Sequence, residues 1–168
     1  MIAAIVATDL TNGIGFKNKL LVNIKEDLQY FKALTTSNIV IMGRNTYESL
    51  PKKPLPNRVN IVITHHPETI EGNAICMDLD EVKAWLKKYG TKTANNIFVI
   101  GGEQIYKELL PYCERVYLTK IYKKFDEVDA YFPDITASAE WGLSSTSEGK
   151  EENGIDYQFR IYDRKGYF

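Results

Sequence analysis

The segment Ile39-Val-Ile-Met-Gly-Arg-Asn-Thr-Tyr-Glu-Ser-Leu50 runs from an apolar strand through a glycine into an amphipathic stretch. The same order recurs in Phe98-Val-Ile-Gly-Gly-Glu-Gln-Ile-Tyr106. Parallel strands need a crossover connection, which is usually a helix, so strand, glycine and helix in this order are typical of α/β proteins. The two segments therefore predict an α/β fold with a largely parallel sheet.

The same alternation extends along the chain on both sides of these segments. Short runs rich in Ile and Val predict buried strands at Ile2–Ala7, Ile39–Met42, Val59–Ile63, Ile97–Ile100 and Val116–Thr119. Amphipathic stretches between them predict helices at Lys25–Thr35, Asn45–Leu50, Leu79–Tyr89 and Glu103–Leu110. Near the end, Leu143–Glu148 and Tyr157–Asp163 predict an antiparallel hairpin, with Gly149–Gly154 as its turn.

Two segments lack regular periodicity. Thr8–Asn23 is long for a connector, and Pro51–Arg58 contains three prolines, which remove hydrogen-bond donors and fix φ. In open α/β sheets, ligands bind at the carboxyl ends of the strands. We therefore expect both segments to lie along a cleft.

Length and composition narrow the class of protein. The 168 residues suit one domain, residues 1–168, and the formal net charge of −1 disfavours a nucleic-acid-binding protein. No apolar run is long enough for a membrane span, and the apolar start is soon interrupted by Asp9, which disfavours a signal peptide. Cys76 and Cys113 are too few for a disulfide framework. We expect a monomeric cytoplasmic protein with two free thiols.

The first predicted helix carries the most informative residue. Asn23 is expected to cap it, with Glu26 completing a capping box. Its apolar stripe is Ile24, Leu28, Phe31 and Leu34, and Asp27 falls inside that stripe. Either Asp27 is an exposed acid stabilised by the helix dipole, or it is a lone carboxylate facing an apolar site.

Glycines end two of the predicted strands just before helices. Helix N-termini offer free amides, so Gly43 with Arg44, and Gly101 with Gly102, would suit a ligand with several phosphates. These glycines could instead only permit close packing, and no G-x-G-x-x-G pattern supports a Rossmann fold. His65 and His66 are adjacent and have no third histidine, so no metal site is expected.

Taken in order, these segments resemble dihydrofolate reductases of the bacterial type. The matching pieces span nearly the whole chain and are Ala7, Ile14-Gly15, Asn23, Asp27-Leu28, Phe31-Lys32, Val40–Arg44, Thr46, Glu48-Ser49, Pro54–Pro56, Arg58–Ile61, Val99–Gly102, Tyr106 and Tyr117–Thr119. The resemblance implies a central eight-stranded, mostly parallel sheet with an antiparallel C-terminal strand, flanked by four helices. It also implies hydride transfer from NADPH to C6 of dihydrofolate, with a proton added at N5.

The resemblance assigns roles on the substrate side. Asp27 would pair with the pterin ring, and Thr119 would hydrogen-bond this carboxylate or the pterin amino group through water. Arg58 would clamp the glutamate α-carboxylate of the substrate, beside Leu55. The remaining apolar walls would be Ile5, Ala7, Leu28, Phe31, Leu50 and Ile100.

The resemblance also implies a cofactor groove. The mobile loop from Ile14 to Leu20 would cover the nicotinamide and exclude water, which adds Leu20 to the catalytic set of Asp27 and Thr119. Arg44, Thr64 and His65 would receive the 2′-phosphate, and a cis peptide would join Gly101 to Gly102. The other expected cofactor contacts are Ala7, Ile14, Gly15, Asn18, Gly43, Asn45, Thr46, Ile63, Ile100, Gly101, Gly102, Glu103, Gln104, Ile105 and Tyr106.

One departure keeps other functions open. The family usually has Pro-Trp where this chain has Leu21-Val22, and Val22 cannot hold a water by hydrogen bonding. A non-catalytic binding protein on the same fold is therefore an alternative. A reductase acting on another pterin or on a riboflavin-pathway pyrimidine is a second one, in which Arg58 would be dispensable.

Overall fold

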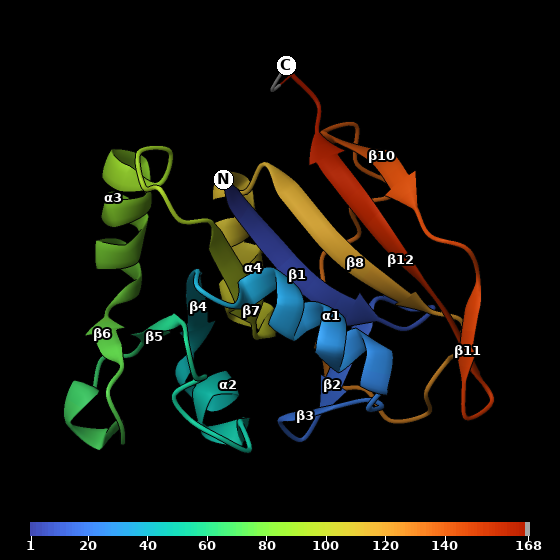
Figure 1. The fold of residues 1–168 in the computed structure, drawn as a ribbon, viewed down its shortest axis with the longest axis horizontal. Coiled ribbons are helices and arrows are strands. Elements are labelled where there is room, and N and C mark those ends of the chain that lie inside the picture. Colours follow the sequence, from blue (N-terminus) through green and yellow to red (C-terminus); the bar gives the residue numbers. More distant parts are fainter. Residues whose placement is uncertain (167–168) are drawn as a thin grey trace.

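A twisted central sheet forms the middle of the computed structural model, which describes residues 1–166 (Figure 1). Its strands follow the order β10-β12-β8-β1-β7-β4-β5-β6, and β11 extends the hairpin of β12. The strands are β1 (Ile2–Thr8), β4 (Ile39–Gly43), β5 (Val59–Ile63), β6 (Ile75–Met77), β7 (Ile97–Gly101), β8 (Arg115–Ile121), β10 (Trp141–Thr146), β11 (Lys150–Glu152) and β12 (Ile155–Arg164). The expected eight-stranded sheet is confirmed along this path.

Strand directions also follow the prediction. The pairs β1–β7, β1–β8, β4–β7, β4–β5 and β5–β6 are all parallel. The C-terminal strand β12 runs antiparallel to β8 and to β10. The mostly parallel part is covered on both faces, which is why its strands read as continuous apolar runs.

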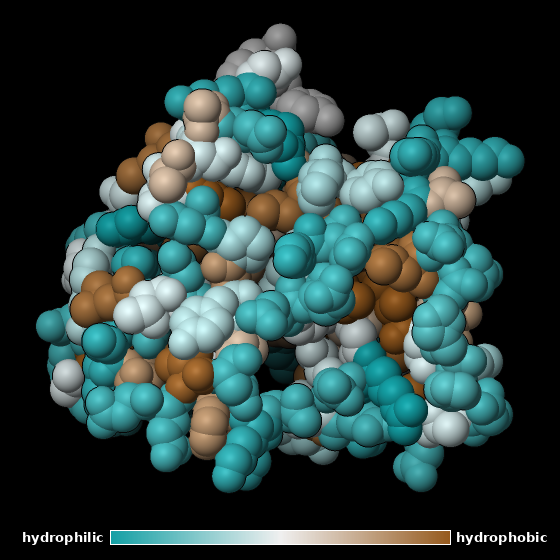
Figure 2. Space-filling model, turned by 180° about the vertical axis from the view of Figure 1, so that it is seen from behind, coloured by the Kyte–Doolittle hydropathy of each residue, from teal (hydrophilic) through white to brown (hydrophobic). Residues whose placement is uncertain are grey.

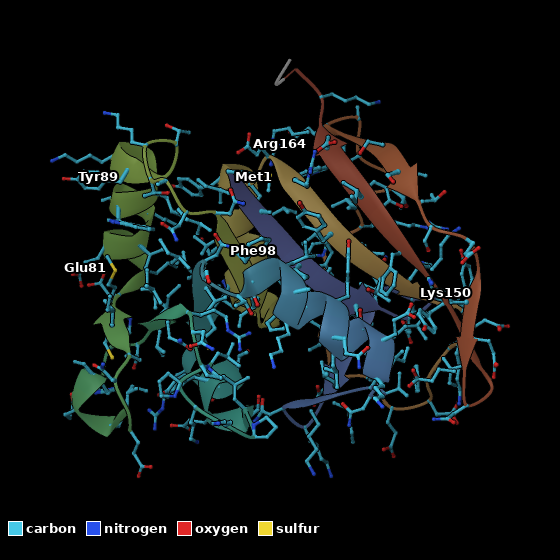
Figure 3. All side chains as sticks on the ribbon, viewed as in Figure 1. Met1, Glu81, Tyr89, Phe98, Lys150 and Arg164 are labelled. Carbon is cyan, nitrogen blue, oxygen red and sulfur yellow. The ribbon has the colours of Figure 1, made fainter. Side chains whose placement is uncertain are left out.

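Four helices cover the two faces of the sheet: α1 (Lys25–Thr35), α2 (Arg44–Ser49), α3 (Leu79–Tyr89) and α4 (Glu103–Leu109). Alternate residues of β1 point to opposite faces. Ala3 and Ile5 pack in a cluster with residues of α1 and α2, whereas Ala4 and Val6 pack in one with residues of α3 and α4. Phe98 of β7 belongs to the first cluster and lies near the middle of the molecule (Figure 3).

The C-terminal hairpin has a tighter turn than predicted. Residues expected to form the turn Gly149–Gly154 include the strand β11, which pairs with β12. The turn itself is Asn153-Gly154, and both residues have positive φ, 52° and 80°. Such a pair forms the two-residue turns that match the twist of a hairpin.

The segment Thr8–Asn23 is more ordered than its sequence indicates. It contains β2 (Gly13–Phe16) and β3 (Lys19–Leu20), which form a separate small sheet with β9 (Ala130–Tyr131). Lys17 and Asn18 make the turn between β2 and β3, with φ of 50° and 62°. These strands have two to four residues and depend on a partner more than 100 positions away, so no local period reveals them.

Two further findings concern all of residues 1–166. Cys76 and Cys113 are both free thiols, as expected. Within residues 1–166, no helix is both long and apolar enough to cross a membrane.

Candidate active site

The helix α1 begins differently from the prediction. Its N-cap is Ile24, and the expected cap by Asn23 with a capping box to Glu26 is wrong. Glu152, on the C-terminal hairpin, supplies the acceptor: its carboxylate accepts hydrogen bonds from the amides of Lys25 at 2.7 Å and Glu26 at 3.4 Å. Lys150 Nζ lies 3.1 Å from Glu26 Oε1 and adds a second link between β11 and this turn. A distant hairpin therefore fixes the start of α1.

Asp27 lies in the first turn of this helix and faces inward. Thr119, on β8, donates its hydroxyl proton to Asp27 Oδ1 across 2.5 Å. Burial raises the pKa of the Asp27 carboxyl above its ordinary value, and the hydrogen bond from Thr119 opposes that rise. The alternative of a fully solvated acid at a helix start is therefore wrong.

The pair of Asp27 and Thr119 is not part of the lining of the main cavity but adjoins a residue that is. The register of β1 on β8 sets Thr119 directly next to Ala7, which lines the cavity. Tyr106 also lines it and donates its hydroxyl to the carbonyl of Ile5 at 2.6 Å. Burial of the ring and, to a smaller extent, the negative charge of Asp27 raise the pKa of Tyr106, so this phenol stays protonated.

The cavity has a volume of about 710 Å³ and runs between the two glycine turns and the small sheet. Seen from behind, the molecule has hollows with apolar floors and hydrophilic rims (Figure 2). The cavity is lined by the predicted residues Ala7, Ile14, Gly15, Asn18, Leu20, Gly43, Arg44, Asn45, Thr46, Ile63, Ile100, Gly101, Gly102, Glu103, Gln104, Ile105 and Tyr106.

Both helices that begin at the cavity are suited to hold phosphates. The N-caps of α2 and α4 are Gly43 and Gly102, and among the described residues no side chain caps either helix. By contrast, Asp78 and Glu81 form a complete capping box on α3. The first-turn amides of α2 and α4 thus keep hydrogen-bonding capacity for an anion. The dinucleotide phosphates implied by the resemblance would suit these two turns.

Close packing explains the glycines of these turns. A Cβ on Gly43 would lie 3.0 Å from Ile105 Cγ1 of the other turn. Gly101 has a φ of +124°, and a Cβ there would lie 3.2 Å from the ring of Tyr106. The peptide between Gly101 and Gly102 is cis, as the resemblance implies.

The three residues expected to receive the 2′-phosphate follow two neighbouring strands, because Gly43 of β4 pairs with Ile63 of β5. Arg44 lines the cavity and is paired with Glu48 at 3.0 Å. Thr64 and His65 are outside the cavity lining, and His65 is exposed. Their role stays a prediction.

The expected substrate side is mostly one apolar cluster. Ile5, Phe31, Leu50, Leu55 and Ile100 all pack in the cluster between the sheet and the helices α1 and α2. Leu28 differs, because it is 45% exposed and lines a separate shallow hollow with Gln29, Lys32 and residues of the hairpin turn.

Arg58 is held in a fixed orientation. Its Nε donates to the carbonyl of Pro56 at 2.9 Å, and one terminal nitrogen donates to the hydroxyl of Thr35 at 3.0 Å. The guanidinium carbon lies 6.0 Å from the centre of the Phe31 ring. Burial lowers the pKa of Arg58, but a guanidinium remains charged at neutral pH. Its remaining N–H groups can bind a carboxylate.

Some lining residues were not predicted individually as site residues: Val6, Lys19, Ser49, Asp129 and Ala130. Ser49 had a signal, because it follows Thr46 by one helical turn. Asp129 had none, since its place depends on non-local contacts: its amide donates to the carbonyl of Gly15, and its carboxylate accepts from the amide of Lys17, both at 3.0 Å. Within residues 1–166, no three His, Cys, Asp or Glu residues form a metal-ligating group.

Comparisons with known proteins agree with this architecture. The family model described as "Dihydrofolate reductase" matches residues 1–164. The dihydrofolate reductase of Bacillus subtilis (strain 168) is 40% identical over 168 residues, which covers 98% of this chain and 95% of that protein. The enzyme of the same name from Aedes albopictus is 35% identical, with 95% of each chain covered.

A solved structure is similar over nearly its full length. It is the dihydrofolate reductase from Enterococcus faecalis complexed with NADP(H) and RAB-propyl. Its TM-score is 0.86 at 32% sequence identity, and the match covers 98% of this chain and 96% of that one.

Proposed function

The chain belongs to the dihydrofolate reductase family, and from this premise we propose how its residues divide the work of the reaction. The reaction is the NADPH-dependent reduction of 7,8-dihydrofolate to 5,6,7,8-tetrahydrofolate, so the chain is an oxidoreductase. NADPH, when bound, supplies the hydride that is added to C6 of the pterin. We further propose that residues 1–168 act as one domain.

Asp27 orients the pterin in this proposal. A carboxylate has two oxygens, which match the ring N3 hydrogen and the 2-amino group. The hydroxyl of Thr119 occupies one lone pair of Oδ1 and fixes the rotation of the carboxylate, while Oδ2 stays free for the ring. A buried carboxylate that gains two N–H donors is stabilised in its charged form, and its charge favours a proton on N5. Water from the side of Leu20 delivers that proton.

The other end of the substrate is held by Arg58. The hydroxyl of Thr35 and the carbonyl of Pro56 use two of its five donors. The rest form a planar fork that suits the two oxygens of the glutamate α-carboxylate. The apolar cluster around Phe31 and Leu50 separates the two polar anchors and matches the aromatic middle of the substrate.

The cofactor contacts rest on the two glycine turns. The amides at the starts of α2 and α4 bind the phosphates, and Arg44 exchanges Glu48 for the 2′-phosphate. Ile14 and Leu20, from the small sheet, cover the nicotinamide and exclude water. We also propose that the chain works as a monomer in the cytoplasm, without nucleic acid or membrane. Its small net charge and two free thiols support this.

One observation carries the proposal: a half-buried carboxylate is hydrogen-bonded to Thr119, which pairs with Ala7 in the wall of a cavity where two uncapped helices begin. The test follows the absorbance of NADPH at about 340 nm in the presence of dihydrofolate. We expect a loss of absorbance that needs both compounds and is slower with NADH. Binding of NADPH without any loss would instead favour the non-catalytic alternative that Val22 suggested.

A further inference from the structure

Asp9 is a buried acid to which the reaction has assigned no role. It follows β1 directly and is 0% exposed. Its Oδ1 accepts three hydrogen bonds, from the amide and the hydroxyl of Thr11 and from the amide of Gly13, each at 2.8 Å. Its Oδ2 accepts a fourth, from the amide of Phe125 at 3.2 Å. The last of these joins residues 116 positions apart.

These four contacts join the two segments that lead into the small sheet. Gly13 is the first residue of β2, and the next two residues, Ile14 and Gly15, line the cavity. Phe125 lies in the segment that leads to β9, where Ala130 lines the same cavity. The strands β2 and β9 pair with each other. The strands β2 and β9 form one wall of the cavity. One carboxylate therefore binds the start of β2 and the segment that leads into β9.

Backbone contacts surround the same point. The amide of Asp9 donates to the carbonyl of Gly13 at 2.9 Å, and the amide of Leu10 donates to the carbonyl of Lys123 at 3.0 Å. The packing is tight, because a Cβ on Gly13 would lie 2.9 Å from Asp9 Oδ1 and 2.8 Å from Val128 Cγ1. The junction therefore leaves no room for a side chain at position 13.

The charge of Asp9 depends on these donors. Among residues 1–166, no Lys, Arg or His nitrogen lies within ion-pair distance of it. Burial alone would raise its pKa, yet the hydrogen bonds from Gly13, Thr11 and Phe125 hold the pKa of Asp9 below its ordinary value. A buried carboxylate that loses such donors is costly, so a shift of either segment is penalised.

We propose that Asp9 is a positioning residue that fixes the wall formed by β2 and β9 against the nicotinamide end of the cavity. The inference rests on the proposed function, because it takes the cavity to be the cofactor groove. Asp9 touches neither the cavity nor the reacting atoms. It acts through Gly13 on Ile14 and Gly15, and through Phe125 on Ala130.

The variant Asp9→Asn tests this with little change in shape. The amide group has one acceptor oxygen, so whichever way it is turned, its NH₂ faces backbone N–H donors. We expect faster amide hydrogen exchange at Gly13 and Phe125. We also expect an NADPH dissociation constant raised about tenfold and single-turnover hydride transfer slowed about tenfold, because small misplacements of reacting groups are costly. The affinity for dihydrofolate should stay near the wild-type value.

Asp134→Asn is the matched control. Asp134 makes the same local contacts as Asp9, accepting from the amide of Thr136 at 3.1 Å and from its hydroxyl at 2.6 Å. It is exposed and has no contact comparable to the one with Phe125. We expect its NADPH affinity and hydride-transfer rate to equal those of the wild type.

The outcomes separate the inference from a merely structural role. If Asp9→Asn lowers the melting temperature but leaves NADPH affinity and hydride transfer as in Asp134→Asn, the inference is wrong. Should Asp9→Asn not fold, Thr11→Val removes one of the four donors and should shift the same readouts less, in the same direction; no shift would overturn the inference. A wild type that is silent with dihydrofolate would instead overturn the proposed function.

Discussion

The cofactor groove and the substrate side of the site are built in different ways. The groove takes its donors from the backbone of two short turns, each a strand, a glycine and a helix in unbroken sequence. The substrate side joins side chains that are far apart in the chain: Thr119 and Asp27 are 92 positions apart, and Arg58 and Thr35 are 23 apart. One local turn is enough to present backbone amides to a ligand, whereas the whole fold is needed to bring two distant side chains together.

This difference sets what a substitution does in each region. In the groove, the two glycine turns depend on the absence of a side chain, since a Cβ on Gly43 or Gly101 would meet its neighbours. On the substrate side, function depends on single polar atoms whose removal leaves the packing intact. Substrate-side variants should therefore lose activity while keeping their stability, and groove variants should lose both.

Asp27→Asn should have the largest effect and tests the substrate side of the comparison. An amide cannot accept both pterin hydrogens and carries no charge. We expect kcat/KM at neutral pH to fall about 100-fold, equivalent to roughly 2.7 kcal/mol. Asp80→Asn, an exposed first-turn acid of α3, is the control and should be fully active. A fully active Asp27→Asn enzyme would remove this carboxylate from the mechanism.

Although Asp27→Asn should lose activity, it should gain stability at neutral pH. A carboxyl whose pKa is raised by folding favours the native state below its unfolded pKa, and loses that contribution as the pH rises through the folded value. The variant should therefore be more stable than the wild type at neutral pH, with a difference that shrinks in acid. Urea unfolding at several pH values measures it. A variant less stable at neutral pH would contradict the burial argument.

Arg58→Ala should rank second. Loss of a charge-assisted contact should weaken dihydrofolate binding by about 1.5–3 kcal/mol, with NADPH affinity unchanged. Arg58→Lys should recover only part, because an ammonium cannot present the planar fork. Isothermal titration calorimetry gives both constants. An unchanged dihydrofolate affinity would point to a substrate without the glutamate carboxylate.

Gly101→Ala sharpens the groove side of the comparison. Its φ of +124° disfavours an L side chain, and the added Cβ would press on Tyr106. We expect a stability loss of about 1–3 kcal/mol together with weaker NADPH binding. Gly149→Ala, with nothing within 4 Å of its added Cβ, is the control. If Gly101→Ala binds NADPH normally, this turn does not hold the phosphates.

Glu152→Ala should have the smallest effect. It removes the acceptor for the first amides of α1, and loss of a helix cap costs about 1 kcal/mol of unfolding free energy. Glu148→Ala, which removes an 84% exposed carboxylate from the same end of the molecule, should cost less. Equal stabilities of the two variants would show that Glu152 does not cap α1.

The sequence could predict what is local. The helices Lys25–Thr35 and Leu79–Tyr89 have the predicted bounds, because apolar spacing marks helices of this length. The glycine turns could also be predicted, because each is formed by contiguous residues. The cap of α1 could not be predicted in this way, because Glu152 lies 127 positions from Lys25, whose amide donates to it.

The small sheet was missed for the same reason. Its strands are too short to show a period. They are held by non-local contacts, of Asp9 with Phe125 and of Asp129 with Gly15 and Lys17. Asp27 lies between these cases. Its place in an apolar stripe raised the question of burial, but only the fold could bring Thr119 to its carboxylate.

The ionisation of Asp27 tests the central claim most directly. Carboxyl carbons labelled with ¹³C can be titrated by NMR, and the signal that disappears in Asp27→Asn identifies this residue. We predict that it titrates above the ordinary value of 3.8 in the free enzyme, because burial raises the pKa. Folate should keep it ionised to lower pH by pairing with it. A carboxyl that titrates at its ordinary value in the free enzyme, or whose pKa folate leaves unchanged, would contradict the account.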